Sequence, residues 1–388
     1  MGQTHRVGAT VGTQQKKPIR VAMIAFAANH HTTRWSRALA ATGLDVHVIG
    51  VAGSDGVPLV TREQRTPGRA IPVLSAASDW WSAIAECKPD VVYMQWLFAR
   101  PAMLLALDPA WPLVTTVMGS DVRQDPSLHE SMLERTWRTA LLLRAERITA
   151  VAGPLADVVA KYHPDLAAKT EIVPFGVDTQ QFHPPKGAVR RLPQQPLVVG
   201  HFKSDDVVYG RLDLLRALTL VQAEGQEIVL HLAGRRGNDG GAVTRYLRDH
   251  PHLAACVVDH GLLNVDDIAQ LYRQLDVYVM NSLQESFGVA AAEALATGVP
   301  VIASAVGGVR CLVRSGDTGI LIPPADPLAL SRALLEFAHF PELAESCGQR
   351  GRARVQSRFE WNVTVARMAE LIREAAASGS ANAHPLAA

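Results

Sequence analysis

The chain has 388 residues, more than one hydrophobic core usually organises, so two domains are expected. Apolar residues make up 48% of it and charged residues 19%, which is typical of a globular protein. The formal net charge of +1 argues against nucleic acid or a strongly anionic surface as a partner. No apolar run approaches the roughly 20 residues of a membrane-spanning helix.

The ends of the chain and its cysteines bear on its cellular environment. The first 17 residues contain no apolar core and do not resemble a secretory signal. The cysteines, Cys87, Cys256, Cys311 and Cys347, are far apart and include no C-x-x-C pair. We therefore expect reduced thiols in a cytoplasmic protein. No group of His or Cys residues has the spacing of zinc ligands, and we expect neither a metal nor another cofactor.

The first half of the chain alternates apolar strand patterns with helical patterns. Strands are expected at Ile19–Ala25, Asp45–Gly50, Asp90–Tyr93, Leu113–Met118 and Ile148–Val151, and helices at Arg34–Thr42, Asp79–Glu86, Pro101–Leu107, Leu128–Ala145 and Pro154–Tyr162. This alternation predicts a doubly wound parallel sheet, whose ligands bind at the carboxyl ends of the strands. We assign residues 18–184 to this domain and residues 1–17 to a flexible lead-in.

The loop after the first strand, Ala27–Thr33, is a candidate ligand-binding loop because of its place at a strand end. It contains Asn29, His30 and His31. These side chains face an acceptor in one interpretation and are turn and capping residues in the other.

A second candidate loop follows the strand that ends near residue 118. Its Asp121 either contacts a ligand or caps the turn through its own backbone. The helix expected next carries Arg135, Arg138 and Arg144. Their simplest interpretation is a solvated helix face.

The second half of the chain repeats the alternation after a linker. The segment His183–Pro196 is rich in proline and arginine, as linkers often are. Strands are expected at Leu197–His201, Ile228–Ala233, Cys256–His260, Asp276–Met280 and Val299–Ala303, with helices at Leu214–Glu224, Val265–Leu275, Pro327–Phe337 and Trp361–Ala375. They predict a second doubly wound domain over residues 197–358, with a loose tail at residues 378–388.

The stretch Val279–Gly308 concentrates the residues that suggest chemistry. Glu285 lies in a loop, Gly288 precedes a helix of small residues, and Glu293 lies on that helix, seven residues after Glu285. A helix N-terminus offers free amides and the positive end of a dipole to a phosphate, and small residues let a ligand approach the backbone. Carboxylates accept hydrogen bonds from sugar hydroxyls, so the pattern suggests a nucleotide sugar. Alternatively, Glu285 caps the helix and Glu293 is solvated.

This stretch resembles the E-x7-E element of retaining glycosyltransferases of family four, which have the GT-B fold. The matching residues are Glu285-Ser286-Phe287-Gly288, the run EALATGVPV from Glu293 to Val301, and Gly307-Gly308. The segment Glu171–Asp178 with Phe182 resembles another family signature, I-x-V-I-P-N-G-V-D-x-x-x-F, with Phe175 in place of its Asn. The resemblance runs from about Ile19 to Ala375 and is stronger in the second domain.

The resemblance implies two facing Rossmann-like domains with a cleft between them. The first domain would bind the acceptor and the second the nucleotide sugar, and a C-terminal helix at residues 359–376 would cross back to the first domain. The implied reaction moves a sugar, with retention, from a UDP- or GDP-sugar to a hydroxyl of a glycan, a lipid-linked molecule or a small molecule. It would need no metal and would serve glycan, polysaccharide or glycoconjugate synthesis. Transient contact with a membrane is compatible with it.

The resemblance also assigns residues to roles. Glu285, Lys203 and Asp121 are the candidate catalytic residues, and Asn29, His30 and His31 are on the acceptor side. The donor would be bound by Glu293, Arg211, His201, Phe287, Gly288, Val289 and Leu263. Lys203 and Arg211 would neutralise the leaving diphosphate, Glu285 would bind the sugar and Glu293 the ribose. Alternatively, Lys203 and Arg211 are surface residues without a ligand.

Two positions depart from the family pattern and keep rival functions open. Met118 stands where relatives often have His, and His201 stands where they usually have Arg. One rival is a nucleotide-sugar-binding protein that keeps the fold without turnover. The other is a different GT-B enzyme, such as an epimerase or a phosphorylase. A phosphorylase would need a pyridoxal lysine, and no local signature for one stands out.

Overall fold

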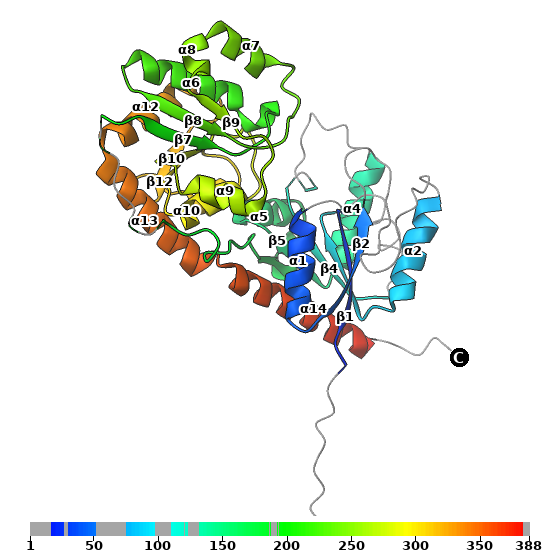
Figure 1. Ribbon diagram of the computed structural model, residues 1–388. Helices are drawn as coiled ribbons and strands as arrows, with labels where there is room; N and C mark the ends of the chain where they lie inside the picture. The colour runs from blue at the N-terminus through cyan, green and yellow to red at the C-terminus, as the bar shows by residue number, and fades with distance from the viewer. Residues whose placement is uncertain are drawn as a thin grey trace, which may run out of the picture.

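The computed structural model describes residues 17–26, 30–51, 75–97, 110–119, 121–122, 132–185, 187, 192 and 194–382. These residues form two α/β domains, each organised by one parallel sheet (Figure 1). The predicted pair of doubly wound domains is therefore confirmed. The helix expected at Pro101–Leu107 lies outside the described residues.

The first sheet has the strand order β2-β1-β3-β4-β5-β6 over the described part of the chain. Its strands are β1 (Arg20–Phe26), β2 (Asp45–Val51), β3 (Val91–Gln95), β4 (Leu113–Val117), β5 (Arg147–Ala150) and β6 (Thr170–Ile172). Every residue of the central strands β3 and β4 is buried, and most are apolar, because helices cover both faces of the sheet. In β1 every residue from Val21 to Ala25 is fully buried.

The helices of the first domain divide between the two faces of its sheet. They are α1 (His30–Ala41), α2 (Ser75–Cys87), α4 (Met132–Arg144) and α5 (Gly153–Tyr162). Trp35 and Leu39 of α1 pack with Met23 on one face. Leu141 of α4 and Leu155 of α5 join the apolar cluster on the other.

The second sheet has the order β12-β11-β10-β7-β8-β9 among the described strands. They are β7 (Leu197–His201), β8 (Ile228–Leu232), β9 (Val257–Asp259), β10 (Val277–Met280), β11 (Val301–Ser304) and β12 (Gly319–Ile322). The order reverses between β7 and β10. In open α/β sheets the ligand crevice lies at this switch point, beyond the carboxyl ends of the strands.

The second domain also carries helices on both faces. They are α6 (Arg211–Ala223), α7 (Ala242–Asp249), α8 (Pro251–Ala254), α9 (Val265–Tyr272), α10 (Val289–Ala296), α11 (Val309–Leu312), α12 (Pro327–His339) and α13 (Pro341–Arg358). Helix α6 begins three residues before the expected Leu214. The reason is Gly210, whose left-handed backbone (φ 71°) ends the preceding turn and whose carbonyl accepts from the Leu214 amide.

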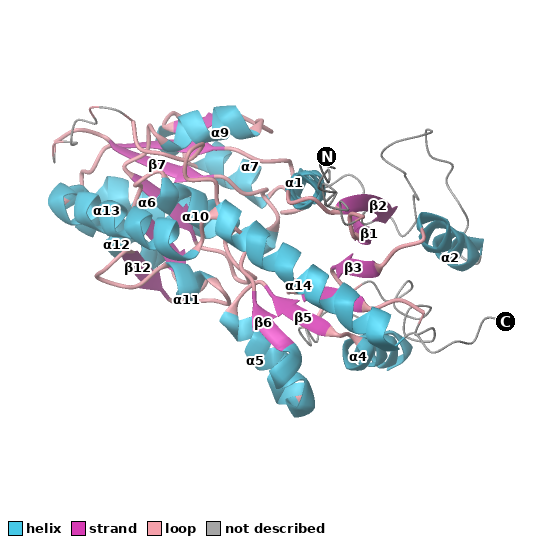
Figure 2. Cartoon of the chain, turned by 90° about the horizontal axis from the view of Figure 1, so that it is seen from below, coloured by secondary structure: helices cyan, strands magenta, loops and turns pink. Residues whose placement is uncertain are grey.

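The last helix, α14 (Trp361–Asn382), leaves the second domain and packs under the sheet of the first (Figure 2). Its Met368 and Ile372 are buried in the same cluster as Val21 of β1. Where α14 begins, the Trp361 amide donates to the Val177 carbonyl at 3.0 Å, and the Val177 amide donates to Phe359 at 2.8 Å. Backbone hydrogen bonds therefore join the segment at Val177, where the chain leaves the first domain, to the segment at Phe359–Trp361, where it returns.

Among the described residues, no helix combines the length and the apolar character that a membrane span requires.

Candidate functional site

The switch point of the second sheet brings a lysine and a glutamate together. Lys203 follows β7 and Glu285 lies in the loop after β10, so residues 82 apart in sequence meet. The Lys203 Nζ donates to Glu285 Oε2 at 2.7 Å, and their side chains are 17% and 14% exposed. The pair therefore sits where the topology predicts a ligand, close to solvent yet mostly shielded from it.

The environment of Lys203 keeps it charged. Burial opposes a charge on its amine, but the neighbouring Glu285 carboxylate outweighs burial and raises the pKa of Lys203 above its usual range. The Lys203 Nζ also lies 4.8 Å from the centre of the Tyr209 ring, a cation–π distance. A fixed ammonium at this point is suited to a phosphate oxygen.

Arg211 is hydrogen-bonded to the backbone of the loop that carries Lys203. It is 6% exposed at the start of α6, and its Nη2 donates to the Lys203 carbonyl oxygen. Burial lowers the pKa of Arg211, although Asp205 and Asp259 oppose that shift. Two of the predicted cations are thus in contact, and Arg211 holds the backbone of Lys203 rather than lying beside it at the surface.

His201 lies beneath the same loop. It is fully buried, and its Nδ1 is 3.1 Å from the Val279 carbonyl oxygen, which can only accept, so Nδ1 carries the proton. Burial, with the charges of Arg211 and Lys203, lowers the pKa of His201 to about 3. The neutral ring therefore cannot supply the positive charge that relatives of the resembled family have at this position.

The N-terminus of α10 faces the same crevice, but its small residues have a different reason from the one expected. Gly288 has φ 97°, and a Cβ there would lie 3.0 Å from Val309 Cγ2 and 3.3 Å from Met280 Sδ. Ala291 and Ala292 are fully buried. Protein packing and backbone conformation therefore require the small residues, while the first amides of α10, from Val289 onward, lack partners within the helix.

Phe287 packs inward. Its side chain is 1% exposed, with ring centroids 6.1 Å from Phe175 and 5.6 Å from Phe359. His31 of α1 lies 5.4 Å from Phe175 on the other side. The four rings run from the first domain to the second, so the side chain of Phe287 joins the domains and leaves only its backbone for a donor.

Glu293 is a partly buried residue of α10, so the solvated alternative is wrong. The Tyr272 hydroxyl lies 3.5 Å from Glu293 Oε2, but it donates to the nearer Ala290 carbonyl oxygen at 2.8 Å. Burial raises the pKa of Glu293 to about 7, with Arg34 and Lys203 opposing the shift. The Glu293 carboxylate can therefore accept hydrogen bonds from another group.

Asp121 takes the turn-capping alternative. It is 2% exposed, and its carboxylate accepts from the amides of Met118 at 3.0 Å, Gly119 at 2.7 Å and Leu97 at 3.2 Å. Burial raises the pKa of Asp121, and these amides partly offset the shift. With both oxygens used by the backbone, Asp121 shapes the loop and offers little surface to a sugar.

The loop that contains Gly119 and Asp121 is in direct contact with the loop that contains Glu285 and Ser286. A Cβ on Gly119 (φ 143°) would lie 2.0 Å from Ser286 Oγ, and one on Gly308 would lie 2.7 Å from Ala152 Cβ. Glycine is therefore needed at both points for the two domains to approach. Ser286 is next to Glu285, so the first domain reaches the Lys203–Glu285 pair through Gly119.

The remaining predicted residues are placed less fully. Asn29 lies outside the described residues, and of His30 only the backbone, at the start of α1, is described. Leu263 is partly buried in the turn after β9, against the apolar cluster that continues between the domains. Its neighbour Leu262 is 80% exposed.

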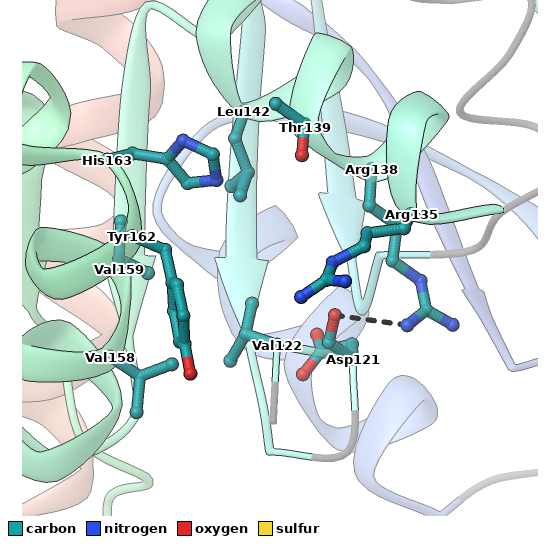
Figure 3. Close-up of a pocket in the computed structure, with 10 residues that line it drawn as sticks. All are labelled: Asp121, Val122, Arg135, Arg138, Thr139, Leu142, Val158, Val159, Tyr162 and His163. Atoms are coloured by element: carbon teal, nitrogen blue, oxygen red, sulfur yellow. Dashed lines mark hydrogen bonds between the residues drawn. The ribbon is translucent and has the colours of Figure 1, made fainter. Parts of the chain in front are cut away.

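Of the α4 arginines expected to form a solvated face, Arg135 is exposed, whereas Arg138 and Arg144 are partly buried. Arg138 Nη1 donates to the Asp121 carbonyl oxygen at 3.4 Å, and Arg144 Nη2 donates to the Trp111 carbonyl. Arg135 and Arg138 line a pocket between α4 and α5 (Figure 3). Its other lining residues are Asp121, Val122, Thr139, Leu142, Val158, Val159, Tyr162 and His163. The spacing of Arg135, Arg138 and Leu142 on one helix face was a usable signal.

No group of three or more His, Cys, Asp or Glu side chains suited to a metal occurs in the described parts of the chain.

Two Rossmann-like domains with a C-terminal helix that returns to the first domain fit the GT-B class of glycosyltransferase fold. Models of two families match the halves of the chain: "Glycosyltransferase Family 4" over residues 28–181 and "Glycosyl transferases group 1" over residues 190–354. The chain belongs to this family-4 type of glycosyltransferases, as its motifs predict.

Characterised relatives and solved structures are consistent with this family. A D-inositol 3-phosphate glycosyltransferase of Streptomyces scabiei is 32% identical over 60% of this chain and 55% of the relative. The matched region thus spans about half the length of such relatives. A glycogen synthase of Mycobacterium tuberculosis is 24% identical over 92% of both chains. Sucrose-phosphate synthase of Thermosynechococcus elongatus superposes with a TM-score of 0.73 at 22% identity, over 93% of this chain and all of that one.

Proposed function

We propose that the protein transfers a sugar from a nucleotide diphosphate sugar to an acceptor hydroxyl, with retention of the anomeric configuration. The observation that carries this proposal is the Lys203–Glu285 pair at the switch point of the second sheet. Glu285 lies just before the N-terminus of α10, and Lys203 is bonded to it. The lysine and the helix amides can bind a diphosphate, and the glutamate can bind a sugar next to it.

In the proposed reaction Lys203 stabilises the leaving diphosphate. Negative charge grows on the bridging phosphate oxygen as the glycosidic bond breaks, and a cation that is already fixed costs little reorganisation. The first amides of α10 add hydrogen bonds to the same group. Arg211 holds the Lys203 carbonyl and so positions the lysine. Side chains and amides fill the role of a cation, and no metal is invoked.

The diphosphate also changes the partner of Lys203. Glu285 accepts a hydrogen bond from Lys203 at 2.7 Å. The diphosphate as a whole carries more negative charge than one carboxylate and competes for the ammonium. Glu285 is then available to the hydroxyls of the donor sugar, while the partly buried Glu293 accepts from the ribose diol.

The names of similar proteins support a nucleotide-sugar donor. The Anabaena protein HepE, 18% identical with a TM-score of 0.72 over 92% of this chain and all of that one, was solved in complex with UDP. A further structure of HepE contains UDP-glucose. We propose a UDP- or GDP-sugar as donor here. The relatives named for inositol phosphate, glycogen and sucrose phosphate differ in acceptor, so the acceptor is proposed only as a hydroxyl compound of glycan or glycoconjugate synthesis.

One observation favours a second candidate, a nucleotide-sugar-binding protein without turnover. His201 is neutral and fully buried, so one cation expected in the family is missing from the diphosphate site. Lys203 must then neutralise the leaving diphosphate without a second positive charge from position 201.

Lys203→Met tests the proposal and separates the two candidates. The wild type should bind UDP or GDP in a thermal-shift screen and release nucleotide from a matching sugar donor. Lys203→Met should lower that turnover roughly 100- to 1,000-fold, the usual cost of losing one preorganised charge-stabilising group. Lys203→Arg keeps the charge and is the control.

Nucleotide binding without turnover by the wild type, with any sugar donor and a panel of hydroxyl acceptors, would establish the binding protein. A wild type that binds no nucleoside diphosphate would refute both candidates.

A further inference from the structure

Helix α1 carries an arginine, Arg34, that none of the roles above uses. The helix lies on the side of the first domain that faces the second (Figure 1). Its His31 is 5.4 Å from Phe175, and Phe175 is 6.1 Å from Phe287, which lies just before α10. Arg34 is three residues after His31, about one turn further along the same face of α1. The side chain of Arg34 therefore lies at the boundary between the domains.

An aromatic ring holds the Arg34 guanidinium in place. Its central carbon lies 3.8 Å from the centre of the Trp361 ring, a cation–π distance. Trp361 begins α14, where the chain returns to the first domain. The Nη2 atom of Arg34 is buried and makes no hydrogen bond to any residue that the structure describes. A positive charge is thus fixed at the boundary by stacking rather than by a bonded carboxylate.

Three acidic side chains act on Arg34 electrostatically, and Glu293 is the first of them. Burial lowers the pKa of Arg34, and the charges of Glu293, Asp178 and Glu360 oppose this shift. Two of these acids are engaged with other donors. Asp178 accepts from two backbone amides of its own turn, and Glu360 accepts from the Thr179 hydroxyl at 2.6 Å. Glu293 is the acid to which the proposed function assigns the ribose.

The effect on Glu293 is reciprocal. Burial raises the pKa of Glu293 to about 7, and Arg34 comes first among the groups that oppose this shift, ahead of Lys203 and Tyr272. Tyr278 of β10 also interacts with this carboxylate. The charge of Lys203 is partly balanced by its ion pair with Glu285. Charges that are shielded from water attract over several ångström without a hydrogen bond, because the local dielectric constant is low.

We propose that Arg34 is a positioning residue for nucleotide binding: its charge, brought from the first domain, keeps Glu293 of the second domain in the ionised form that binds the ribose diol. An ionised carboxylate accepts from both hydroxyls, and each bond is stronger than one to a neutral acid. The inference rests on the proposed role of Glu293 and makes ribose recognition depend on both domains. By linkage, nucleotide binding then favours the arrangement in which α1 lies against the second domain.

The contribution of the ribose is measured by titrating UDP and 2′-deoxy-UDP calorimetrically into the full-length protein at pH 7 and pH 9. GDP and 2′-deoxy-GDP replace them if the thermal-shift screen selects guanosine. The preference for the ribonucleotide over its deoxy form reports on the ribose diol. Arg34→Gln should lower this preference at pH 7 roughly threefold or more, because less of Glu293 is ionised. At pH 9 the preference should recover, since Glu293 then ionises without Arg34.

Two variants control for structural effects. Arg37→Gln removes the same charge from an exposed position of α1 and should leave the preference unchanged. Arg34→Lys keeps the charge and should retain most of the preference. A wild-type preference in Arg34→Gln, even with both nucleotides bound more weakly, would overturn the proposal. A preference that is lost at pH 7 and stays lost at pH 9 would also overturn it, because ionisation of Glu293 would not be the cause.

A measurement without nucleotide separates this inference from the proposed function. Glu293→Gln is compared in the wild-type and Arg34→Gln backgrounds by urea unfolding at pH 5 and pH 9. The pKa of Glu293 is higher in the folded protein than its ordinary value, so stability falls as the pH rises, and without Arg34 this loss should be larger. The stability that Glu293→Gln gains from pH 5 to pH 9 should therefore be greater in the Arg34→Gln background.

Equal gains in the two backgrounds would overturn the proposal even if the protein binds UDP and transfers sugar. A greater gain in the Arg34→Gln background, in a protein that binds no nucleoside diphosphate, would support the action of Arg34 on Glu293 while refuting the proposed function.

Discussion

The two domains place a carboxylate at corresponding points, a loop at the carboxyl end of a parallel strand, and use it differently. In the second domain Glu285 accepts from the side chain of Lys203 and is 14% exposed. In the first domain Asp121 accepts from three backbone amides and is 2% exposed. A side-chain partner can be exchanged for a ligand, whereas the amides of a folded loop cannot. The comparison assigns chemistry to Glu285 and loop architecture to Asp121.

Glu285→Gln should give the largest effect among these carboxylates. Transfer should fall by about 3 kcal/mol of transition-state stabilisation, roughly 100-fold or more, because an amide accepts a sugar hydroxyl more weakly and leaves Lys203 without its anionic partner. Initial rates with a saturating donor measure this, and UDP affinity is the control, which should change much less. A rate within twofold of the wild type would return Glu285 to a capping role.

Asp121→Ala should lower stability rather than chemistry. It leaves the amides of Met118, Gly119 and Leu97 without their acceptor, and unsatisfied buried groups cost about 1–3 kcal/mol each before water or relaxation repairs them. We expect a loss of about 3 kcal/mol, read as a lower Tm of the first domain. Asp121→Asn keeps one accepting oxygen and should lose less.

The contrast between the domains would fail if Asp121→Ala kept its Tm but lost transfer as strongly as Glu285→Gln. Asp121 would then act on the substrate, as the first interpretation of its sequence position has it.

The sequence carries the fold because the fold depends on local patterns. The run Val21–Ala25 is apolar throughout, as suits a strand covered on both faces, and β10 of the second sheet, Val277–Met280, is likewise fully buried. The observed start of helix α6 differs from the expected one because the left-handed backbone of Gly210 fixes where the helix begins. The motif that contains Glu285 and Glu293 likewise predicted the family, whose model matches residues 190–354.

The parts of the site that the sequence did not reveal depend on distant partners. One amide that Asp121 binds belongs to Leu97, 24 residues earlier, so its burial could not be read locally. His201 was expected to bind the donor from the end of a strand, but its Nδ1 faces the Val279 carbonyl, 78 residues later. Arg135 becomes a pocket residue only because α5 packs beside α4. In each case the fold places a distant residue next to the site residue, and the local sequence does not indicate which residue that is.

The raised pKa of Glu293 predicts how the stability of the protein changes with pH. Its pKa in the folded protein is about 7, against an ordinary value of 4.5, so the folded state holds more protons than the unfolded state between these values. Stability therefore falls as the pH rises from about 4.5 to 7. Arg34, Lys203 and Tyr272 face the carboxylate and limit the cost.

Glu293→Gln removes this titration. Relative to the wild type, the variant should gain about 2 kcal/mol between pH 5 and pH 8, measured by urea unfolding at both values. Other titrating groups contribute equally to both proteins and cancel in the difference. UDP binding should weaken in the variant at pH 8, where the wild-type carboxylate is ionised and accepts more strongly from the ribose diol. A stability difference that stays constant with pH would mean that Glu293 is ionised throughout this range and that burial does not hold a proton on its carboxylate.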